Sequence, residues 1–144
     1  MSAVALDSPA RMRSSAAEPT RAALWTGRVL SGIAMLLLAF DVITKIIALP
    51  SVVRASAQAG WSADLIPVIG WIGAICLVLY LIPRTAPLGA VLWTGYLGGA
   101  VASNLRLHLP LFTYVLPPIY VAVFIWGGLY LRDARVRRVL DPAR

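Results

Sequence analysis

The sequence has little of the chemistry on which small redox enzymes and metal centres depend. In 144 residues it contains one cysteine, Cys76, and one histidine, His108. A single thiol excludes both a disulfide framework within the chain and a C-x-x-C redox motif. One histidine and one cysteine cannot make a four-ligand zinc site, and they exclude bis-histidine haem ligation within one chain. We therefore expect no metal site.

Charged residues are also scarce. They make up 13% of the chain, whereas soluble domains usually carry about 25% and cover their surface with them. Hydrophobic residues make up 60%, and the mean hydropathy is +0.81. Disorder of the whole chain is excluded by the same numbers, because disordered chains are poor in apolar side chains. The composition predicts an integral membrane protein.

Four apolar runs account for most of the chain, and each is close to the roughly 20 residues that a membrane-spanning helix needs. The runs cover about 29–49, 65–82, 88–107 and 110–131. They are too long for strands and lack the two-residue alternation of a barrel, so we predict an all-α fold, a transmembrane four-helix bundle within residues 25–131. Residues 1–24 are expected to form a disordered cytoplasmic tail, and residues 132–144 a basic cytoplasmic tail.

Most of the basic residues, twelve arginines and one lysine in all, flank the apolar runs instead of forming a patch, and Lys45 lies inside the first run. For four spans, ten arginines fall on the side that holds both termini and two, Arg54 and Arg106, on the other. Cytoplasmic loops carry the excess of arginine and lysine, so we expect both termini in the cytoplasm. The net charge of +7 is explained by the lipid bilayer as a partner, and we set nucleic acid aside.

Polar residues inside the spans mark a candidate ligand site. Asp41 and Lys45 are four residues apart in the first span and therefore share a helix face. An intramembrane charge costs at least about 2.5 kcal/mol, so it needs a partner, a cavity or protonation. In the third span Asn104 and Arg106 lie at a similar depth, and in the fourth Pro117 and Pro118 free the carbonyls one turn before them. With Thr44, these groups are predicted to line one polar pocket in the outer half of the membrane.

Two interpretations of this cluster are open. In the first, Asp41 pairs with Lys45 and Arg106 and only holds the first and third spans together. In the second, the cluster binds a small polar or quinone-like ligand, or a proton: Asp41 and Lys45 fix the ligand, Arg106 meets an anionic group and Asn104 donates a hydrogen bond.

Glycines are concentrated in the last two spans. Gly95, Gly98 and Gly99 lie within TGYLGGA, and Gly127 and Gly128 follow in the fourth span. Small residues let helix backbones approach closely in lipid. We predict that these glycines pack helices within the bundle, with a dimer interface as the alternative.

The chain resembles the DoxX-like family of small four-helix bacterial membrane proteins. The resemblance is carried by Asp41-x-x-x-Lys45 and by the segments LYLIPRTAPLGA, TGYLGGAVASNLR and WGGLYLRD. Asn104 departs from the pattern, since similar sequences often have histidine there. The resemblance implies a location in the bacterial inner membrane and suggests electron transfer there, with quinone as the candidate cofactor and a membrane or redox protein as the candidate partner.

The predicted function is thus a DoxX-like membrane protein that binds a small ligand or quinone as a subunit of a membrane oxidoreductase. The alternative is a non-enzymatic scaffold or assembly protein that recruits a partner through its glycine-rich helix faces. A homo-oligomer is compatible with both.

Overall fold

The computed structural model describes residues 20–140, and all regular structure in this part of the chain is helical. The elements are α1 (Arg21–Ile46), α2 (Pro50–Gln58), α3 (Leu65–Leu81), α4 (Ala86–Arg106), the π-helical turn η2 (Leu111–Val115), α5 (Leu116–Arg132) and α6 (Ala134–Leu140). Each predicted apolar run falls on a helix: α1, α3, α4, or η2 with α5. Residues 21–24, expected in the tail, are helical, and part of the expected basic tail forms α6. Residues 1–19 and 141–144 of the two tails lie outside the described residues.

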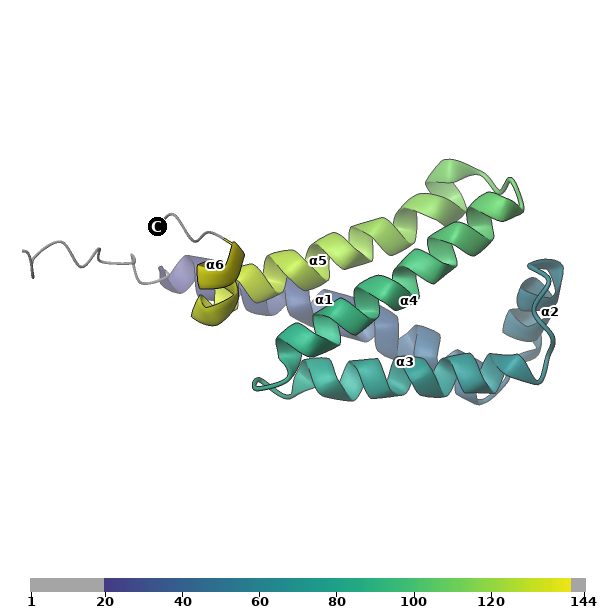
Figure 1. Ribbon diagram of the computed structural model, residues 1–144, viewed down its shortest axis with the longest axis horizontal. Coiled ribbons are helices and arrows are strands. Elements are labelled where there is room, and N and C mark those ends of the chain that lie inside the picture. The colour runs from purple at the N-terminus through teal and green to yellow at the C-terminus, as the bar shows by residue number, and fades with distance from the viewer. Residues whose placement is uncertain (1–19, 141–144) are drawn as a thin grey trace, which may run out of the picture.

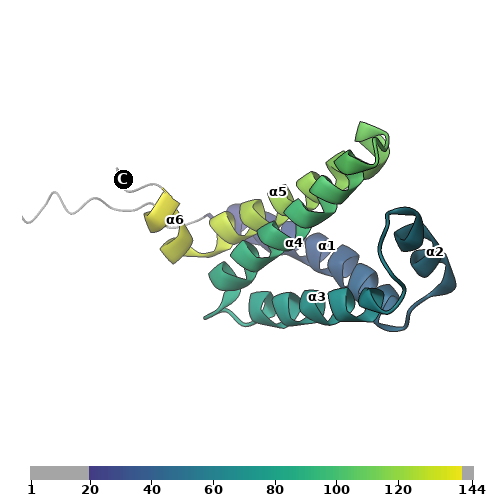
Figure 2. The ribbon, with the colours of Figure 1, turned by 45° about the vertical axis from the view of Figure 1, so that its right-hand side comes forward.

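Each of the four long helices packs against the long helix that follows it in the chain, and the last, α5, packs against the first, α1. α1 packs against α3 and α5, and α4 packs against the same two helices. The start of α1, the α3–α4 corner and α6 lie at one end of the molecule, the α6 end, and α2 lies at the other, the α2 end (Figures 1 and 2). Successive long helices therefore run in opposite directions.

The outside of the molecule is apolar. Two helical segments are long and apolar enough to cross a bilayer, Arg21–Ile46 and Leu111–Arg132, while the apolar α3 has only 17 residues. Large hydrophobic side chains are exposed along α1, α3, α4 and α5, among them Leu36, Phe40, Trp71, Ile75 and Val123. Contiguous apolar surface of this extent marks a protein or membrane contact. The helices therefore suit lipid on their outer faces.

Small residues decide where the helices approach most closely. A Cβ on Gly128 of α5 would collide with Ser31 Oγ and would lie 2.9 Å from the carbonyl of Gly27, both on α1. A Cβ on Gly89 would lie 2.5 Å from the backbone nitrogen of Tyr80, across the α3–α4 corner. These glycines thus permit backbone contact at the α6 end.

The other glycines singled out from the sequence are less crowded. A Cβ added to Gly95, Gly98 or Gly99 would meet nothing within 4 Å in the described part of the chain, and one on Gly127 would only touch Leu30 at 4.0 Å. Within one chain, the close approaches are made at Gly128 instead. The close packing within the bundle that we predicted for Gly95, Gly98 and Gly99 is not seen among the described residues, and the alternative, a dimer interface, stays a prediction.

Two helices end at the α2 end in the same way. Ala48 follows α1 with φ of 50°, and His108 follows α4 with φ of 54°. The amide of the next residue bonds back to the helix in each case, Leu49 to the carbonyl of Thr44 at 3.0 Å and Leu109 to that of Asn104 at 3.2 Å. A proline then follows each leucine, where the helix cannot continue. These helix ends turn the chain away from the bundle. The polar residues Thr44, Lys45, Asn104 and Arg106 therefore lie in the last turns of α1 and α4.

Candidate functional site

An ion pair on α1 is the centre of the candidate site. Lys45 Nζ donates to both carboxylate oxygens of Asp41 at 2.6 Å. The Lys45 side chain is 19% exposed and that of Asp41 43%, so one edge of the carboxylate stays open. The pairing neutralises two charges that would be costly in hydrocarbon if separate.

Tyr96 of α4 completes this cluster, which we call the Asp41 cluster (Asp41, Lys45, Tyr96). Its hydroxyl donates to Asp41 Oδ2 at 3.3 Å, and Lys45 Nζ lies 5.5 Å from the centre of its ring. The polar link between the first and third spans therefore runs through Tyr96. The sequence alone did not single out Tyr96. The feature that could have indicated its role is a phenol in the middle of an apolar, glycine-rich run.

Trp93 lies one turn before Tyr96 and packs edge-on against its ring, with centroids 5.0 Å apart. The Trp93 side chain is fully buried, and its indole nitrogen has no hydrogen-bond partner among the described residues. Buried polar groups are nearly always paired, so an unpaired one calls for an explanation. The Trp93 ring thus packs beside the Asp41 cluster, and its buried indole N–H has no acceptor among the described residues.

Two glycines of α3 bring this helix close enough to complete the surroundings. A Cβ on Gly70 would lie 3.0 Å from Cβ of Lys45, and one on Gly73 would lie 2.8 Å from Val42 and 3.6 Å from both Trp93 and Tyr96. Larger residues at either position would push α3 away from α1. Helices α1, α3 and α4 consequently meet at the level of the cluster, and the Asp41 side chain stays partly exposed.

The remaining predicted site residues make other contacts. Thr44 is buried and donates to the backbone carbonyl of Asp41 at 2.9 Å. Asn104 donates to the carbonyl of Tyr114 at 2.6 Å, which is one of the carbonyls expected to be freed by Pro118. Arg106 donates to the carbonyl of Ala59, in the connection from α2 to α3, at 3.3 Å.

The structure thus does not bring Asn104 and Arg106 to the carboxylate of Asp41. Along α4, Asn104 is roughly 12 Å and Arg106 roughly 15 Å beyond Tyr96 toward the α2 end. Their contacts hold η2 and the α2–α3 connection instead.

A second polar group joins three helices nearer the α6 end. Tyr80 of α3 donates to the carbonyl of Ile125 on α5 at 3.0 Å, and its hydroxyl lies 3.2 Å from Ser31 Oγ on α1. The guanidinium of Arg132 covers the Tyr80 ring at 5.0 Å. Because all these polar groups are paired within the protein, this group is structural.

No group of three or more histidine, cysteine or acidic residues that could hold a metal is found among the described residues. Cys76 is buried in the apolar core. The Asp41 cluster itself offers an ammonium donor, a phenol and a partly exposed carboxylate.

Comparison with known proteins identifies the family of the chain. The sequence model of the DoxX-like family matches residues 29–128, which include α1 from its third turn and end within α5. Comparisons with curated proteins and with solved structures gave no match. Because the matched segment is well over half of the chain and contains the whole Asp41 cluster, the protein belongs to the DoxX-like family and is a membrane protein.

Proposed function

We propose that this protein binds a small ligand with carbonyl oxygens, such as a quinone, at the Asp41 cluster. The observation that carries the proposal is a surplus of donors. Of the three Nζ protons of Lys45, Asp41 accepts two, and the buried indole N–H of Trp93 has no acceptor among the described residues. A quinone offers acceptor oxygens and no donors, on an apolar ring that is soluble in the bilayer.

The open edge of Asp41 gives the cluster a second capacity. A carboxylate that is paired with an ammonium group and a phenol can pass a proton between them without leaving an isolated charge in the membrane. Lys45 would donate its remaining Nζ proton to the ligand, Tyr96 would keep its hydrogen bond to Asp41, and Asp41 would balance the charge. Electrons would have to come from a partner protein, so we place the chain as the membrane subunit of an oxidoreductase.

The topology that goes with this function is a four-span bundle with both termini in the cytoplasm of a bacterium and the Asp41 cluster in the outer half of the inner membrane. The alternating helix directions and the arginines at the α6 end support it. α3 is shorter than the other spans, and α2 lies across the end of the bundle, where an interfacial helix is expected.

Quinone binding can be measured directly on the purified full chain. A short-chain benzoquinone is titrated while tryptophan fluorescence is recorded, with Trp93→Phe as the variant that removes the reporter nearest the site. Lys45→Met is expected to weaken binding about tenfold or more, because it removes a ligand donor in an apolar site. The double variant Asp41→Asn/Lys45→Met also removes the Lys45 donor, but it leaves no unpaired charge in the cluster. Arg106→Gln, outside the cluster, is the matched control.

The competing interpretation makes a different forecast for the same variants. If the pair only holds α1 and α4 together, Asp41→Asn and Lys45→Met lower the melting temperature and leave quinone affinity at the value of Arg106→Gln. That result would overturn the proposal. Mass spectrometry of small molecules that remain bound after purification identifies the natural ligand.

The alternative is a scaffold that recruits a membrane protein through α4. It is favoured by one observation, the open space beside Gly95, Gly98 and Gly99. A stoichiometric partner that co-purifies in mild detergent and is lost on Gly95→Leu or Gly99→Leu would support this function. Quinone affinity should then be unaffected by the same substitutions.

A further inference from the structure

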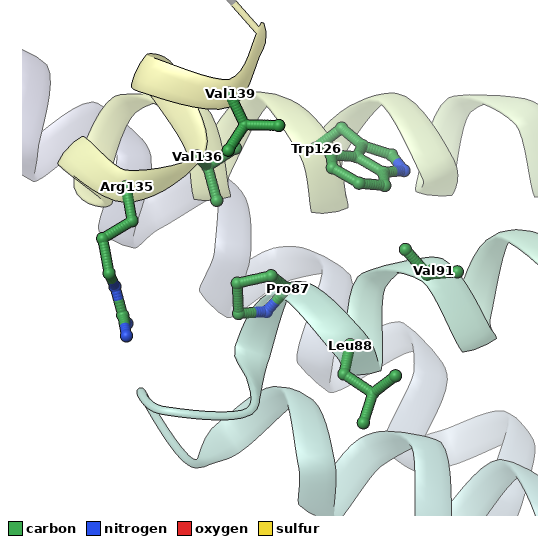
Figure 3. Close-up of a pocket in the computed structure, with 7 residues that line it drawn as sticks. All are labelled: Pro87, Leu88, Val91, Trp126, Arg135, Val136 and Val139. Atoms are coloured by element: carbon green, nitrogen blue, oxygen red, sulfur yellow. The ribbon is translucent and has the colours of Figure 1, made fainter.

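A separate groove opens between α4, α5 and α6, and none of its lining residues belongs to the Asp41 cluster. It has a volume of about 360 Å³ and is lined almost entirely by apolar side chains, a size within the range of about 300–1,000 Å³ that is usual for small-molecule sites. Pro87, Leu88 and Val91 of α4 form one wall, and Trp126, Val136 and Val139 form the other (Figure 3).

Helix α6 is what makes this surface a groove. The chain turns out of α5 at Asp133, whose carboxylate accepts from the backbone N–H of Arg135 at 2.8 Å. The Arg135 side chain then donates to the carbonyl of Pro83, in the α3–α4 corner, at 2.7 Å. These bonds hold α6 against the bundle, where Val136 is buried while Val139 remains 79% exposed.

The chemistry of the groove is that of an amphiphile site. Trp126 uses its indole N–H on Thr94 at 2.9 Å and therefore presents apolar ring surface to the groove. The elements at this end of the molecule carry several arginines, of which Arg135 lines the groove: Arg84, Arg132, Arg135, Arg137 and Arg138. Among the described residues Asp133 is the one carboxylate at this end, and it is already paired with Arg135 at 3.0 Å. The excess positive charge calls for an anionic partner.

We propose that this groove binds an anionic glycerophospholipid from the leaflet in which α6 lies. An acyl chain lies against Trp126, Val91 and Val139, and the phosphate meets the arginines of α6. The position supports this occupant, because α6 begins two residues after the last residue of an apolar membrane helix, at the depth of the lipid headgroups. Basic pockets between membrane helices bind acidic headgroups by the same charge complementarity.

The test is native mass spectrometry of the full chain in mild detergent, offered equal amounts of phosphatidylglycerol and phosphatidylcholine. Phosphatidylglycerol is expected to be retained about tenfold better. Val91→Trp fills the groove and should remove that retained lipid. Val68→Trp, an equally exposed position on α3, is the matched control and should not.

The charge is tested separately. Arg137→Gln/Arg138→Gln should bring the two lipids to similar retention, whereas Arg54→Gln should keep the preference. The proposal would be overturned if the unmodified chain retained both lipids equally. It would also be overturned if Val91→Trp and Val68→Trp lost lipid equally, or if Val91→Trp changed the oligomeric state instead of losing lipid. If Val91→Trp does not fold, Leu88→Trp addresses the same wall. Quinone affinity is not expected to change in any of these variants, so this proposal and the function at Asp41 fail independently.

Discussion

Single residues at two levels of the bundle carry much of its polar chemistry, Tyr80 near the last residue of α3 and Tyr96 in the middle of α4. Tyr80 and Tyr96 each connect helices through a hydroxyl group, the first with a carbonyl acceptor and the second with a carboxylate. Only the second partner is an acidic side chain, and only the second tyrosine packs against Trp93, whose buried indole N–H has no acceptor among the described residues. The difference explains why one tyrosine is treated as structural and the other as part of a site.

Ala48 adopts a backbone conformation that favours glycine, since its φ is 50°. For an L-residue this region costs roughly 1–2 kcal/mol. Ala48→Gly is therefore expected to stabilise the protein by about 0.5–1 kcal/mol, seen as a higher midpoint of thermal unfolding in detergent. Ala55→Gly, in the middle of α2, should do the opposite, and a lower midpoint for Ala48→Gly would contradict the assignment.

At the scale of helices, the contact between α1 and α5 depends on Gly128. Any side chain there meets Ser31 Oγ and the backbone of α1, so Gly128→Leu is expected to cost more than about 3 kcal/mol by overpacking. Gly95→Leu is the matched substitution in open space and should leave thermal stability of the isolated chain nearly unchanged. Equal losses for the two would show that the helices approach elsewhere.

The docking of α6 depends on Asp133. Burial opposes its ionisation, but the hydrogen bonds and charge of Arg135 outweigh it and hold the pKa of Asp133 below its usual value. Because the pKa of Asp133 is lower in the folded protein, its carboxylate stabilises the docked α6 fully above the unfolded-state pKa of about 3.9. This stabilisation is lost as the pH falls through the folded-state pKa. Asp133→Ala is expected to speed amide hydrogen exchange in residues 134–140 at neutral pH. Unchanged exchange would mean that Val136 alone holds the helix.

For the whole molecule, the arrangement of helices makes a prediction about topology. In a cysteine-free background, made by Cys76→Ala, a cysteine is introduced by Ala57→Cys in α2 or by Ala134→Cys in α6. A membrane-impermeant maleimide should label the first in intact cells and the second only after lysis, because arginine-rich segments stay in the cytoplasm. Labelling of Ala134→Cys from outside would reverse the orientation.

The amino-acid sequence by itself determined the helical class, the approximate helices and the Asp41–Lys45 pair, because these depend on local composition and on residues one turn apart. It also indicated that Pro118 would free a carbonyl. Only the tertiary structure decided that Tyr96 meets Asp41, that Asn104 and Arg106 turn to backbone carbonyls, and that Gly128 makes the close contact while Gly95 faces open space. Such contacts depend on how helices are rotated and spaced, which no single helix specifies.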